Sequence, residues 1–242
     1  MNSGIYSALT GNIAAMKRLD VLSNNLANVN TPGFKKDRMT FEGMLQAVGA
    51  QPRPGGGTDA PVHAETAFFT DYSPGTVKQT GNAFDLAIDG DGFFAVTTAD
   101  GQRAYTRQGN FRLDSTGRLV TADGAQVAGG IVIAGGKVEI NGRGEIFVDG
   151  SQVGRLEVVD FPKPYALQKL GGGLFVPADP QAAPQPVTGE PVRQGAIEES
   201  NVNTVQEMVQ LIETNRYFEM CSKVVKAYDD LTGKAANELG KI

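Results

Sequence analysis

Few residues in this 242-residue chain could carry catalysis or bind a metal. The sequence contains one histidine, His63, and one cysteine, Cys221. A tetrahedral zinc site needs more nitrogen or sulfur ligands than these two residues supply. Cys221 falls near an apolar stripe, where it is expected to be a small buried hydrophobic residue. Nothing else supports a Cys–His nucleophile, so we expect neither a catalytic residue nor a metal site.

Two glycine-containing segments resemble parts of nucleotide-binding motifs. Gly90 and Gly92 begin like a dinucleotide fingerprint, but Phe93-Phe94 follow and no helical pattern does. We interpret this segment as the turn of a hairpin. Gly135-Gly136-Lys137 resembles a phosphate loop, but Ile131 stands where the first glycine is required. We therefore expect no cofactor and no small-molecule substrate.

The acidic residues Asp85, Asp89 and Asp91 raise the alternatives of a calcium site or a catalytic carboxylate pair. Asp and Gly are more often found in turns for conformational reasons. The formal net charge is -5 and no Lys/Arg-rich block is present, which argues against a nucleic-acid partner. No apolar run approaches the roughly 20 residues that span a bilayer, and we expect no cleaved signal peptide.

Residues 4 to about 28 are expected to form a helix, because apolar residues recur at spacings of three and four. They are Ile5, Leu9, Ile13, Met16, Leu19, Leu22 and Leu26. Asn24, Asn25, Asn28 and Asn30 are poor helix formers. Either the helix end frays there, or the amides hydrogen-bond to another chain or another segment. Pro32-Gly33 predicts a type II turn that ends the helix before the next segment.

The last segment is expected to be a second, longer amphipathic helix. Its apolar residues are Val205, Met208, Val209, Ile212, Tyr217, Met220, Val224, Ala227, Tyr228 and Leu231. Thr204 and Glu207 match a capping box, with Asn203 as the competing cap. Gly233 marks an expected fraying point, with residues 234–242 as a tail. Each helix is too narrow to bury its own stripe, so we expect the two to pair.

Short apolar runs between Gly- and Asp-rich turns fill the middle of the chain, which predicts a sandwich or barrel of strands. The predicted fold class is α+β: an N-terminal and a C-terminal helix paired as a coiled coil, with a central all-β domain between them. We divide the chain into residues 1–34 (helix), 35–75 (linker or extended region), 76–195 (β-rich domain) and 196–242 (helix).

Several sequence blocks, in order along the chain, resemble the bacterial flagellar rod and hook family. They are Asn24 to Phe34, Asp85 to Phe94, Tyr105 to Phe111, Gly117 to Gly124, and Glu199 to Tyr217. The resemblance covers essentially the whole chain, although residues 46–66 match no motif of the family. The short length and the segments at 69–75, 81–82 and 159–161 are most similar to the proximal rod proteins. The distal rod protein is the alternative.

The resemblance implies a structural subunit of the basal-body rod, which assembles into the helical shaft that transmits torque from motor to hook. Its partners would be copies of itself, other rod proteins and the flagellar type III export apparatus. The subunit would be exported to the periplasm-spanning rod without a cleaved signal. A rival from another class is a secreted β-sandwich binding module with helical oligomerisation ends, but the sequence has no Trp to offer as an exposed aromatic. An enzyme is the third alternative.

Under this hypothesis, the residues that make subunit contacts lie on the two helices and at their inner ends. They are Leu9, Ile13, Met16, Leu22, Asn24, Asn25, Leu26, Asn28, Thr31, Pro32, Gly33, Phe34, Asn201, Asn203, Val209, Ile212, Tyr217 and Val224. Apolar seams would supply cohesion, at roughly 25 cal/mol per Å² of buried surface. Buried amides would set the register, because a misaligned polar group goes unsatisfied.

Overall fold

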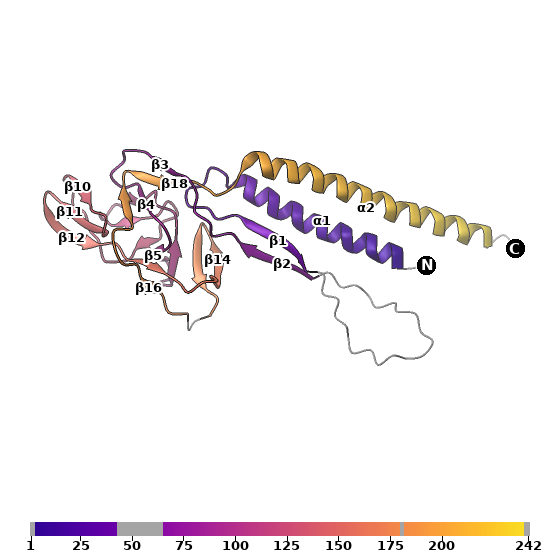
Figure 1. The fold of residues 1–242 in the computed structure, drawn as a ribbon, viewed down its shortest axis with the longest axis horizontal. Helices are drawn as coiled ribbons and strands as arrows, with labels where there is room; N and C mark the ends of the chain where they lie inside the picture. Colours follow the sequence, from indigo (N-terminus) through magenta and orange to yellow (C-terminus); the bar gives the residue numbers. More distant parts are fainter. Residues whose placement is uncertain (1–2, 43–64, 180–181, 240–242) are drawn as a thin grey trace. The chain divides into compact units, whose positions relative to one another are not determined.

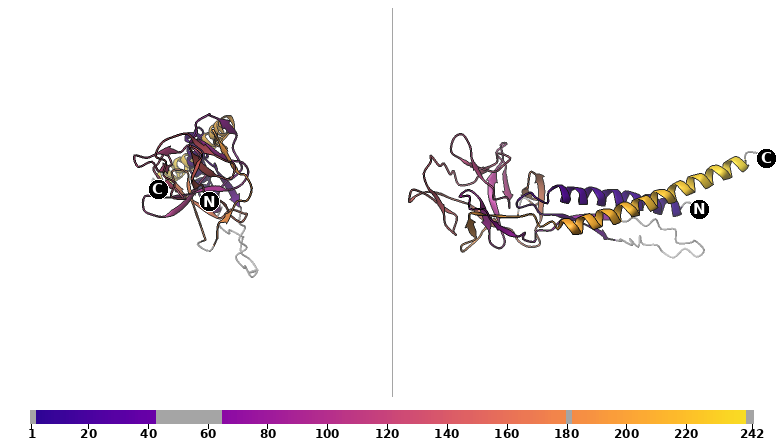
Figure 2. Two further views of the ribbon diagram at one scale, coloured as in Figure 1. Left: turned by 90° about the vertical axis from the view of Figure 1, so that its left-hand side faces the viewer. Right: turned by 90° about the horizontal axis from the view of Figure 1, so that it is seen from above.

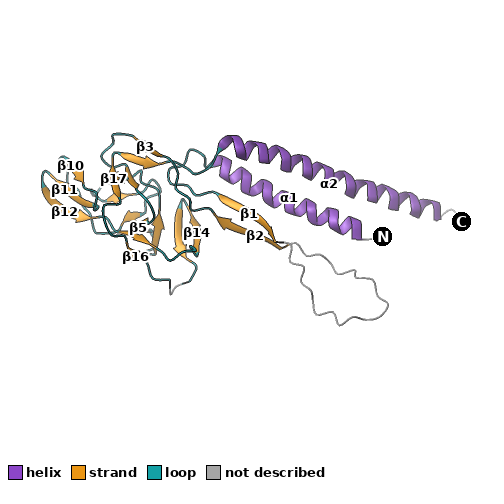
Figure 3. Cartoon of the chain, viewed as in Figure 1, coloured by secondary structure: helices purple, strands orange, loops and turns teal. Residues whose placement is uncertain are grey.

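The computed structural model describes residues 3–42, 65–179 and 182–239, in an α+β fold whose two helices flank a β-rich region along the chain (Figure 3). The chain divides into two compact units. The helical unit comprises Met1–Ala27, Asp37–Asp71 and Asn203–Ile242, and the β unit comprises Asn28–Lys36 and Tyr72–Val202. His63, with the rest of residues 43–64, lies outside the described residues.

The helical unit contains two helices and a pair of strands (Figure 1). Helix α1 (Ser3–Ala27) and helix α2 (Thr204–Leu239) lie side by side, and α2 extends beyond the start of α1 in both Figure 1 and Figure 2. Strand β1 (Asp37–Glu42) pairs antiparallel with β2 (Glu65–Thr70), and β1 contacts α1. These strands fall within residues 35–75, for which we expected a linker or extended region.

The start of α2 differs from the capping-box prediction. The side-chain oxygen of Asn203 accepts a hydrogen bond from the Gln206 amide at 3.1 Å, so Asn203 is the N-cap. Glu207 does not reach back to the cap, because its carboxylate is turned inward to Asn25. The prediction of fraying at Gly233 is also wrong, because the helix continues to Leu239. Gly233 is exposed, so this turn of the helix does not depend on the packing of a side chain at that position.

Every regular element of the described β unit is a strand. The largest sheet has nine strands, with β13 and β16 off the main path. Its order is β14 (Leu167–Gly171), β15 (Leu174–Pro177), β6 (Arg103–Thr106), β5 (Phe93–Thr97), β9 (Gln126–Val127), β8 (Leu119–Val120) and β7 (Arg112–Leu113). Strand β13 (Val158–Asp160) pairs with β5 and with β16 (Gln185–Pro186).

Three smaller sheets complete the β unit. Strands β10 (Val138–Ile140), β11 (Glu145–Val148) and β12 (Ser151–Arg155) form an antiparallel meander. Strand β17 (Val192–Gln194) pairs with β4 (Leu86–Ile88), and β18 (Ala196–Glu198) pairs with β3 (Val77–Gln79). The final strands of the unit are therefore paired with its first ones, which closes the β unit on itself.

The hairpin expected around Gly90 and Gly92 is not formed. Strands β4 and β5 flank these glycines, but β4 pairs with β17, whereas β5 pairs with β6, β9 and β13. Both glycines adopt positive φ, 91° and 122°, which glycine tolerates best. The local pattern identified two strands correctly, but β4 pairs with the distant β17 and β5 pairs with the strand that follows it, β6, so the connection between β4 and β5 joins two sheets.

The β unit has a mainly aliphatic core and an aromatic cluster. The aliphatic core gathers residues from many strands, including the fully buried Leu86, Phe94, Val96 and Ile146. The aromatic cluster centres on Phe93, which contacts four other rings edge-on, those of Tyr72, Phe161, Tyr165 and Phe175, at centroid separations of 5.7–6.2 Å. Edge-to-face geometry is the favoured arrangement of such rings. These cores provide the rigid body to which the chain segments described below are attached.

Candidate assembly surface

The faces of α1 and α2 that pack together repeat with heptad spacing. On α1 the buried and half-buried positions at this spacing are Ala8, Gly11, Ala15, Arg18, Leu22 and Asn25, and Ala14 beside them is also buried. On α2 they are Glu207, Leu211, Thr214, Phe218, Cys221 and Val225. Both sets alternate steps of three and four, which is the spacing of a two-helix seam. The helices run antiparallel, because Asn25 bonds to Glu207 at one end while Gly11 faces Cys221 farther along.

Small residues let the two helices approach closely near Gly11. A Cβ at Gly11 would lie 2.9 Å from the Tyr217 hydroxyl and 3.3 Å from the Cys221 sulfur. Cys221 is buried, as expected. Its hydrogen bond to the Tyr217 hydroxyl, together with its charge when ionised, raises the pKa of that phenol, and burial adds to the effect. At the next residue of each helix, Asn12 donates to the Ser222 hydroxyl at 3.3 Å. This seam is therefore largely small and polar.

In contrast to Leu211, Phe218 and Val225 of the seam, nine large apolar residues of α2 are exposed in the described part of the chain. They are Val205, Met208, Val209, Ile212, Tyr217, Met220, Val224, Tyr228 and Leu231. Ile212 is 54% exposed and Met220 is 58% exposed. Leu9, Ile13 and Met16 form a similar exposed set on α1. We call these twelve residues the outer stripe. Monomeric soluble proteins rarely leave such a contiguous apolar surface in water.

A buried polar cluster joins α1, α2 and the β1–β2 pair inside the helical unit. Asn25 is 1% exposed and donates to the Asp37 carbonyl at 2.9 Å and to a Glu207 carboxylate oxygen at 3.3 Å. Its own side-chain oxygen accepts from the Asp37 amide at 3.0 Å, and the Thr70 hydroxyl donates to the Asp37 carboxylate at 2.7 Å. We call these four residues the helical-unit cluster. The alternative of a frayed helix end is thus wrong at Asn25.

The predicted turn after α1 is present and packs into the β unit. The Phe34 amide donates to the Thr31 carbonyl at 3.3 Å, and Gly33 has a φ of 67°, as a type II turn requires. A Cβ at Gly33 would lie only 2.3 Å from the carbonyl carbon of Arg107. Phe34 is buried beneath the Lys169 ammonium, which lies 4.7 Å from the ring centre. Glycine is therefore required here for both conformation and space.

A second polar cluster, built around a buried ion pair, holds this turn to the β unit. Lys35 Nζ lies 2.6 Å from Glu198 Oε1 and donates to the Ser73 carbonyl at 2.7 Å, with both charged side chains almost fully buried. Asn201 donates to the same Ser73 carbonyl at 3.1 Å and accepts from the Lys36 amide at 2.8 Å. We call Lys35, Ser73, Glu198 and Asn201 the β-unit cluster.

Arg107 supports the β-unit cluster from the sheet. Its Nε lies 2.9 Å from Glu198 Oε2, an ion pair that lacks the alignment of a hydrogen bond. Its two terminal nitrogens donate to the carbonyls of Gly92 and Gly90, at 2.8 and 2.7 Å. The glycine segment that we interpreted as a hairpin turn therefore supplies acceptors to a buried guanidinium. Buried ions need such additional partners to offset their desolvation.

The residues predicted to make subunit contacts fall into two groups in the structure. Seven are exposed members of the outer stripe: Leu9, Ile13, Met16, Val209, Ile212, Tyr217 and Val224. Leu22, Asn25, Gly33 and Phe34 are buried within the chain. Leu26, Asn28, Thr31, Pro32 and Asn201 are half-buried, and Asn24 and Asn203 are exposed. The buried group has intrachain roles, so only the exposed group is available to a neighbour.

Sequence reasoning missed Lys35, Arg107 and Glu198, because isolated charged residues usually lie on the surface. A weak signal was present at Glu198. It alternates with Ala196 in a strand, and side chains two apart share a face. Both are buried, whereas Ile197 between them is half-exposed. Arg107 lies inside a family motif block, but its type alone gave no indication of burial.

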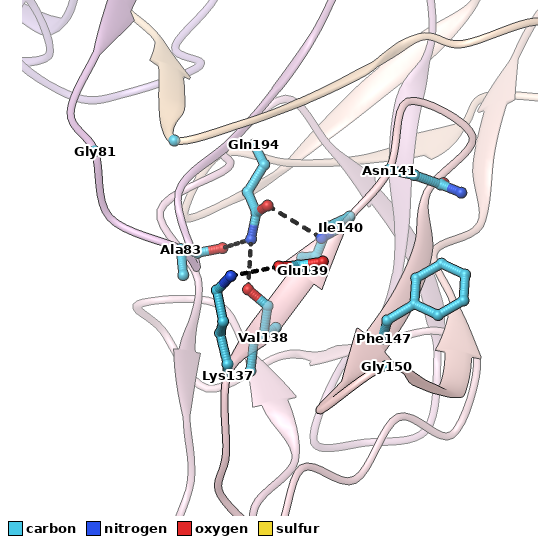
Figure 4. A pocket seen from close by; sticks show the side chains of 11 residues that line it. Gly81, Ala83, Lys137, Val138, Glu139, Ile140, Asn141, Phe147, Gly150 and Gln194 are labelled. Carbon is cyan, nitrogen blue, oxygen red and sulfur yellow. Dashed lines mark hydrogen bonds and ion pairs between the residues drawn. The ribbon is translucent and has the colours of Figure 1, made fainter.

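The β unit has a surface hollow of about 780 Å³ beside β10 and β17 (Figure 4). The Gln194 amide lies at its centre and donates to the carbonyls of Ala83 and Val138, at 3.0 and 3.2 Å. Its oxygen accepts from the Ile140 amide at 3.1 Å. Lys137 is paired with Glu139 at the rim. Both N–H groups and the oxygen of the Gln194 amide are therefore bonded to the backbone of neighbouring segments. Because this amide is not available to a ligand, we assign the hollow no ligand.

The aspartates weighed for calcium are separated in the structure. Asp89 is paired with Arg193 and Asp91 with Lys163, each at 2.6 Å. Within residues 3–42, 65–179 and 182–239, no group of three or more His, Cys, Asp or Glu side chains is placed to hold a metal ion. None of the helices described is long and apolar enough to cross a membrane.

Three family models match successive parts of the chain. Residues 5–35 match "Flagella basal body rod protein", residues 87–148 match "Flagellar hook protein FlgE/F/G D1 domain", and residues 193–239 match "Flagellar basal body rod FlgEFG protein C-terminal". The first and third matches include the two helices with their buried polar residues. The second match lies inside the β unit.

Whole-length relatives carry related names. The chain is 35% identical to the flagellar basal-body rod protein FlgG of Bacillus subtilis, over 98% of this chain and 99% of the relative. It is 34% identical to FlgF of Caulobacter vibrioides, over the full length of both chains. It is also 34% identical to FlgF of Rhizobium meliloti, over 99% of each.

Proposed function

The chain belongs to the family of flagellar basal-body rod proteins, and we propose that it is a proximal-rod subunit whose outer stripe packs against neighbouring subunits. The family is structural, and the chain is a structural component of the flagellar basal body. The observation that carries the proposal is the outer stripe. Twelve large apolar side chains on two long helices have no cover within the described chain.

The heptad seam supports a coiled coil between α1 and α2. At about 1.5 Å per residue, the 25 residues of α1 and the 36 of α2 correspond to roughly 37 and 54 Å. The seam positions are mostly small or polar, so their burial contributes less cohesion than a Leu- or Ile-rich seam would. This explains why the largest apolar residues face outward. The pair becomes a stable core element only when neighbours cover the stripe.

The choice of the proximal over the distal rod rests on chain length. The alignment with the Caulobacter FlgF spans 250 positions, and that with the Bacillus FlgG spans 265, against 242 residues in this chain. Fewer gaps are therefore needed to accommodate the FlgF sequence. The alternative is that the chain is a distal-rod subunit. Cross-linking of the chain to its motor-side or hook-side neighbours in isolated basal bodies distinguishes the two positions.

The partners in this proposal are copies of the same chain and the other rod proteins. Contacts that repeat head to tail without closing into a ring generate a helical tube. Export would proceed through the flagellar type III apparatus. The assembled tube would transmit torque from motor to hook through many shared contacts rather than through one reactive site.

The test compares two neighbouring exposed positions on α2. Ile212→Asn places a polar amide in the outer stripe, whereas Glu213→Asn places the same residue beside it. Both changes leave the seam intact, so both purified proteins should retain the helix content of the parent by circular dichroism. We expect Ile212→Asn to abolish swimming and incorporation into basal bodies, and Glu213→Asn to preserve both. Normal incorporation of Ile212→Asn would refute the assignment.

A further inference from the structure

The chain passes between the helical unit and the β unit at four places: after Ala27, Lys36, Asp71 and Val202. Residues 28–36 are thus an excursion of the chain into the β unit, from which it returns to form β1 and β2. A force applied to the helices can reach the β unit along any of these covalent connections. If they were independent, the shortest connection would bear the load alone.

In the β unit, the β-unit cluster ties the last three of these connections together. Lys35 ends the excursion, Ser73 follows the return, and Asn201 precedes the last connection. The ammonium of Lys35 and the amide of Asn201 share the Ser73 carbonyl, at 2.7 and 3.1 Å. Backbone bonds add to this tie: Gly33 donates to the Glu198 carbonyl at 2.8 Å, and Asn201 donates to the Phe34 carbonyl at 3.3 Å.

The helical-unit cluster makes the equivalent tie in the other unit. Asn25 precedes the first connection, Asp37 follows the second, Thr70 precedes the third, and Glu207 lies in the first turns after the fourth. Asn25 bonds to Asp37 and Glu207, and Thr70 bonds to Asp37. Each of the four connections therefore has a cluster member close to it in the helical unit, and the last three also have one in the β unit.

We propose that these two clusters are load-sharing clamps, which make the four connections act as one when torque passes through the subunit. This inference rests on the proposed rod function. Buried, charge-assisted hydrogen bonds suit the role because they are short and directional, and because breaking them exposes an unpaired ion to a low-dielectric interior. A purely apolar junction would slide more readily, since hydrophobic contacts have no preferred direction.

The clamp predicts a specific event under force. With handles on α1 and on the β unit, the bonds between Lys35 and Ser73 carry the load and keep the chain between them out of the force path. The chain between residues 35 and 73 is released when the β-unit cluster breaks and the β1–β2 pair, which joins Asp37 to Thr70, opens with it. At about 3.4 Å per residue, this release lengthens the molecule by roughly 130 Å in one step.

The experiment is force spectroscopy on the full chain, carrying Cys221→Ser and handle cysteines introduced by Asp20→Cys and Asp100→Cys, both at exposed positions. Glu198→Gln removes the shared carboxylate. The control is a substitution of Ile146, which is fully buried in a sheet remote from the connections. Either Ile146→Val or Ile146→Ala is used, whichever lowers the equilibrium stability by the same amount as Glu198→Gln. At a fixed force, we expect the release step to become about tenfold or more faster in Glu198→Gln than in the matched core variant.

Equal acceleration in both variants, or none in Glu198→Gln, would overturn the clamp. Asn25→Ala tests the helical-unit cluster in the same way, with Asn24→Ala as its neighbour control, and it should accelerate the step where the control does not. The measurement uses the isolated subunit, so it is independent of rod incorporation. If the cluster variants accelerate the release step but the chain is not incorporated into basal bodies, only the proposed function is contradicted. If the chain is incorporated but the cluster variants do not accelerate the step, only this inference is contradicted.

Discussion

Replacing Gly33 with alanine should disrupt the junction between the excursion 28–36 and the β unit. Gly33 has a φ of 67°, and its Cβ would lie 2.3 Å from the Arg107 carbonyl carbon and 2.5 Å from the Gln108 nitrogen. Both are backbone atoms of a buried segment, so no side-chain rotation relieves the overlap. Gly81 provides the matched control, because its φ is 76° but a Cβ there would meet nothing within 4 Å.

The two substitutions share one cost and differ in another. A left-handed backbone costs an alanine about 1 kcal/mol at either position. At Gly33, the overlap must also be relieved by moving the segment by about 1 Å, which weakens the 2.8 Å bond from the Gly33 amide to the Glu198 carbonyl and the packing of Phe34, for about 2 kcal/mol more. We therefore expect losses of about 3 kcal/mol for Gly33→Ala and about 1 kcal/mol for Gly81→Ala.

Urea unfolding followed by near-ultraviolet circular dichroism measures this difference. The chain has no Trp, and three of its six tyrosines, Tyr72, Tyr105 and Tyr165, belong to the aromatic cluster of the β unit, so the near-ultraviolet signal includes the packing of that unit. With a slope of about 2 kcal/mol per M, the midpoint of Gly33→Ala should fall about 1 M below that of Gly81→Ala. Coincident midpoints would refute the reasoning that contact with the Arg107 backbone, and not φ alone, requires glycine.

Three further predictions concern polar groups. Glu198→Gln should lower the free energy of unfolding by about 3 kcal/mol or more, against less than about 1 for the exposed Glu199→Gln, and equal losses in urea titrations would contradict the buried-ion account. Asn25→Ala should lower the free energy of unfolding of the helical unit, measured by thermal melting, by about 1–3 kcal/mol, and Asn24→Ala should lower it by less than about 0.5 kcal/mol. A larger loss for Asn24→Ala than for Asn25→Ala would contradict the role of Asn25 in setting the register of the helices. Hydrogen bonding from Thr116 lowers the pKa of Asp114, so the stabilisation is present above the usual value of 3.8 and lost as pH falls through the lowered pKa; an NMR titration midpoint at or above 3.8 would contradict this.

Periodicity predicted both helices, but it did not predict which face of each would meet the other. The strongest apolar stripe was the natural candidate for the pairing face. The structure instead places Gly11, Ala15 and Thr214 in the seam and leaves Met208 and Ile212 exposed. A stripe shows only that a surface needs cover. The identity of that cover depends on the other chains of the assembly, which one sequence does not contain.

The β unit shows the same limit at the level of pairing. The runs that became β4 and β5 were recognised from local composition, but the pairing of β4 with β17 and of β5 with β13 depends on long-range closure of the unit. The sequence left Asn203 and Thr204 as candidates for the N-cap of α2. Asn203 is the cap because Glu207, which would complete the capping box of Thr204, turns inward and bonds to Asn25. In each case a tertiary contact outweighed a local preference.

The central claim is that the outer stripe of α2 is covered by neighbouring subunits in the assembled rod. Ile212→Cys in a Cys221→Ser background places a thiol on that stripe, at a position that is 54% exposed in the free chain. Maleimide labelling of the purified subunit and of intact basal bodies tests the claim directly, with Glu213→Cys as the neighbouring reference. Rapid labelling of the free subunit and strong protection in the rod is the predicted result, with protection greater at position 212 than at 213. Equal labelling at position 212 in the free and assembled states would contradict the claim.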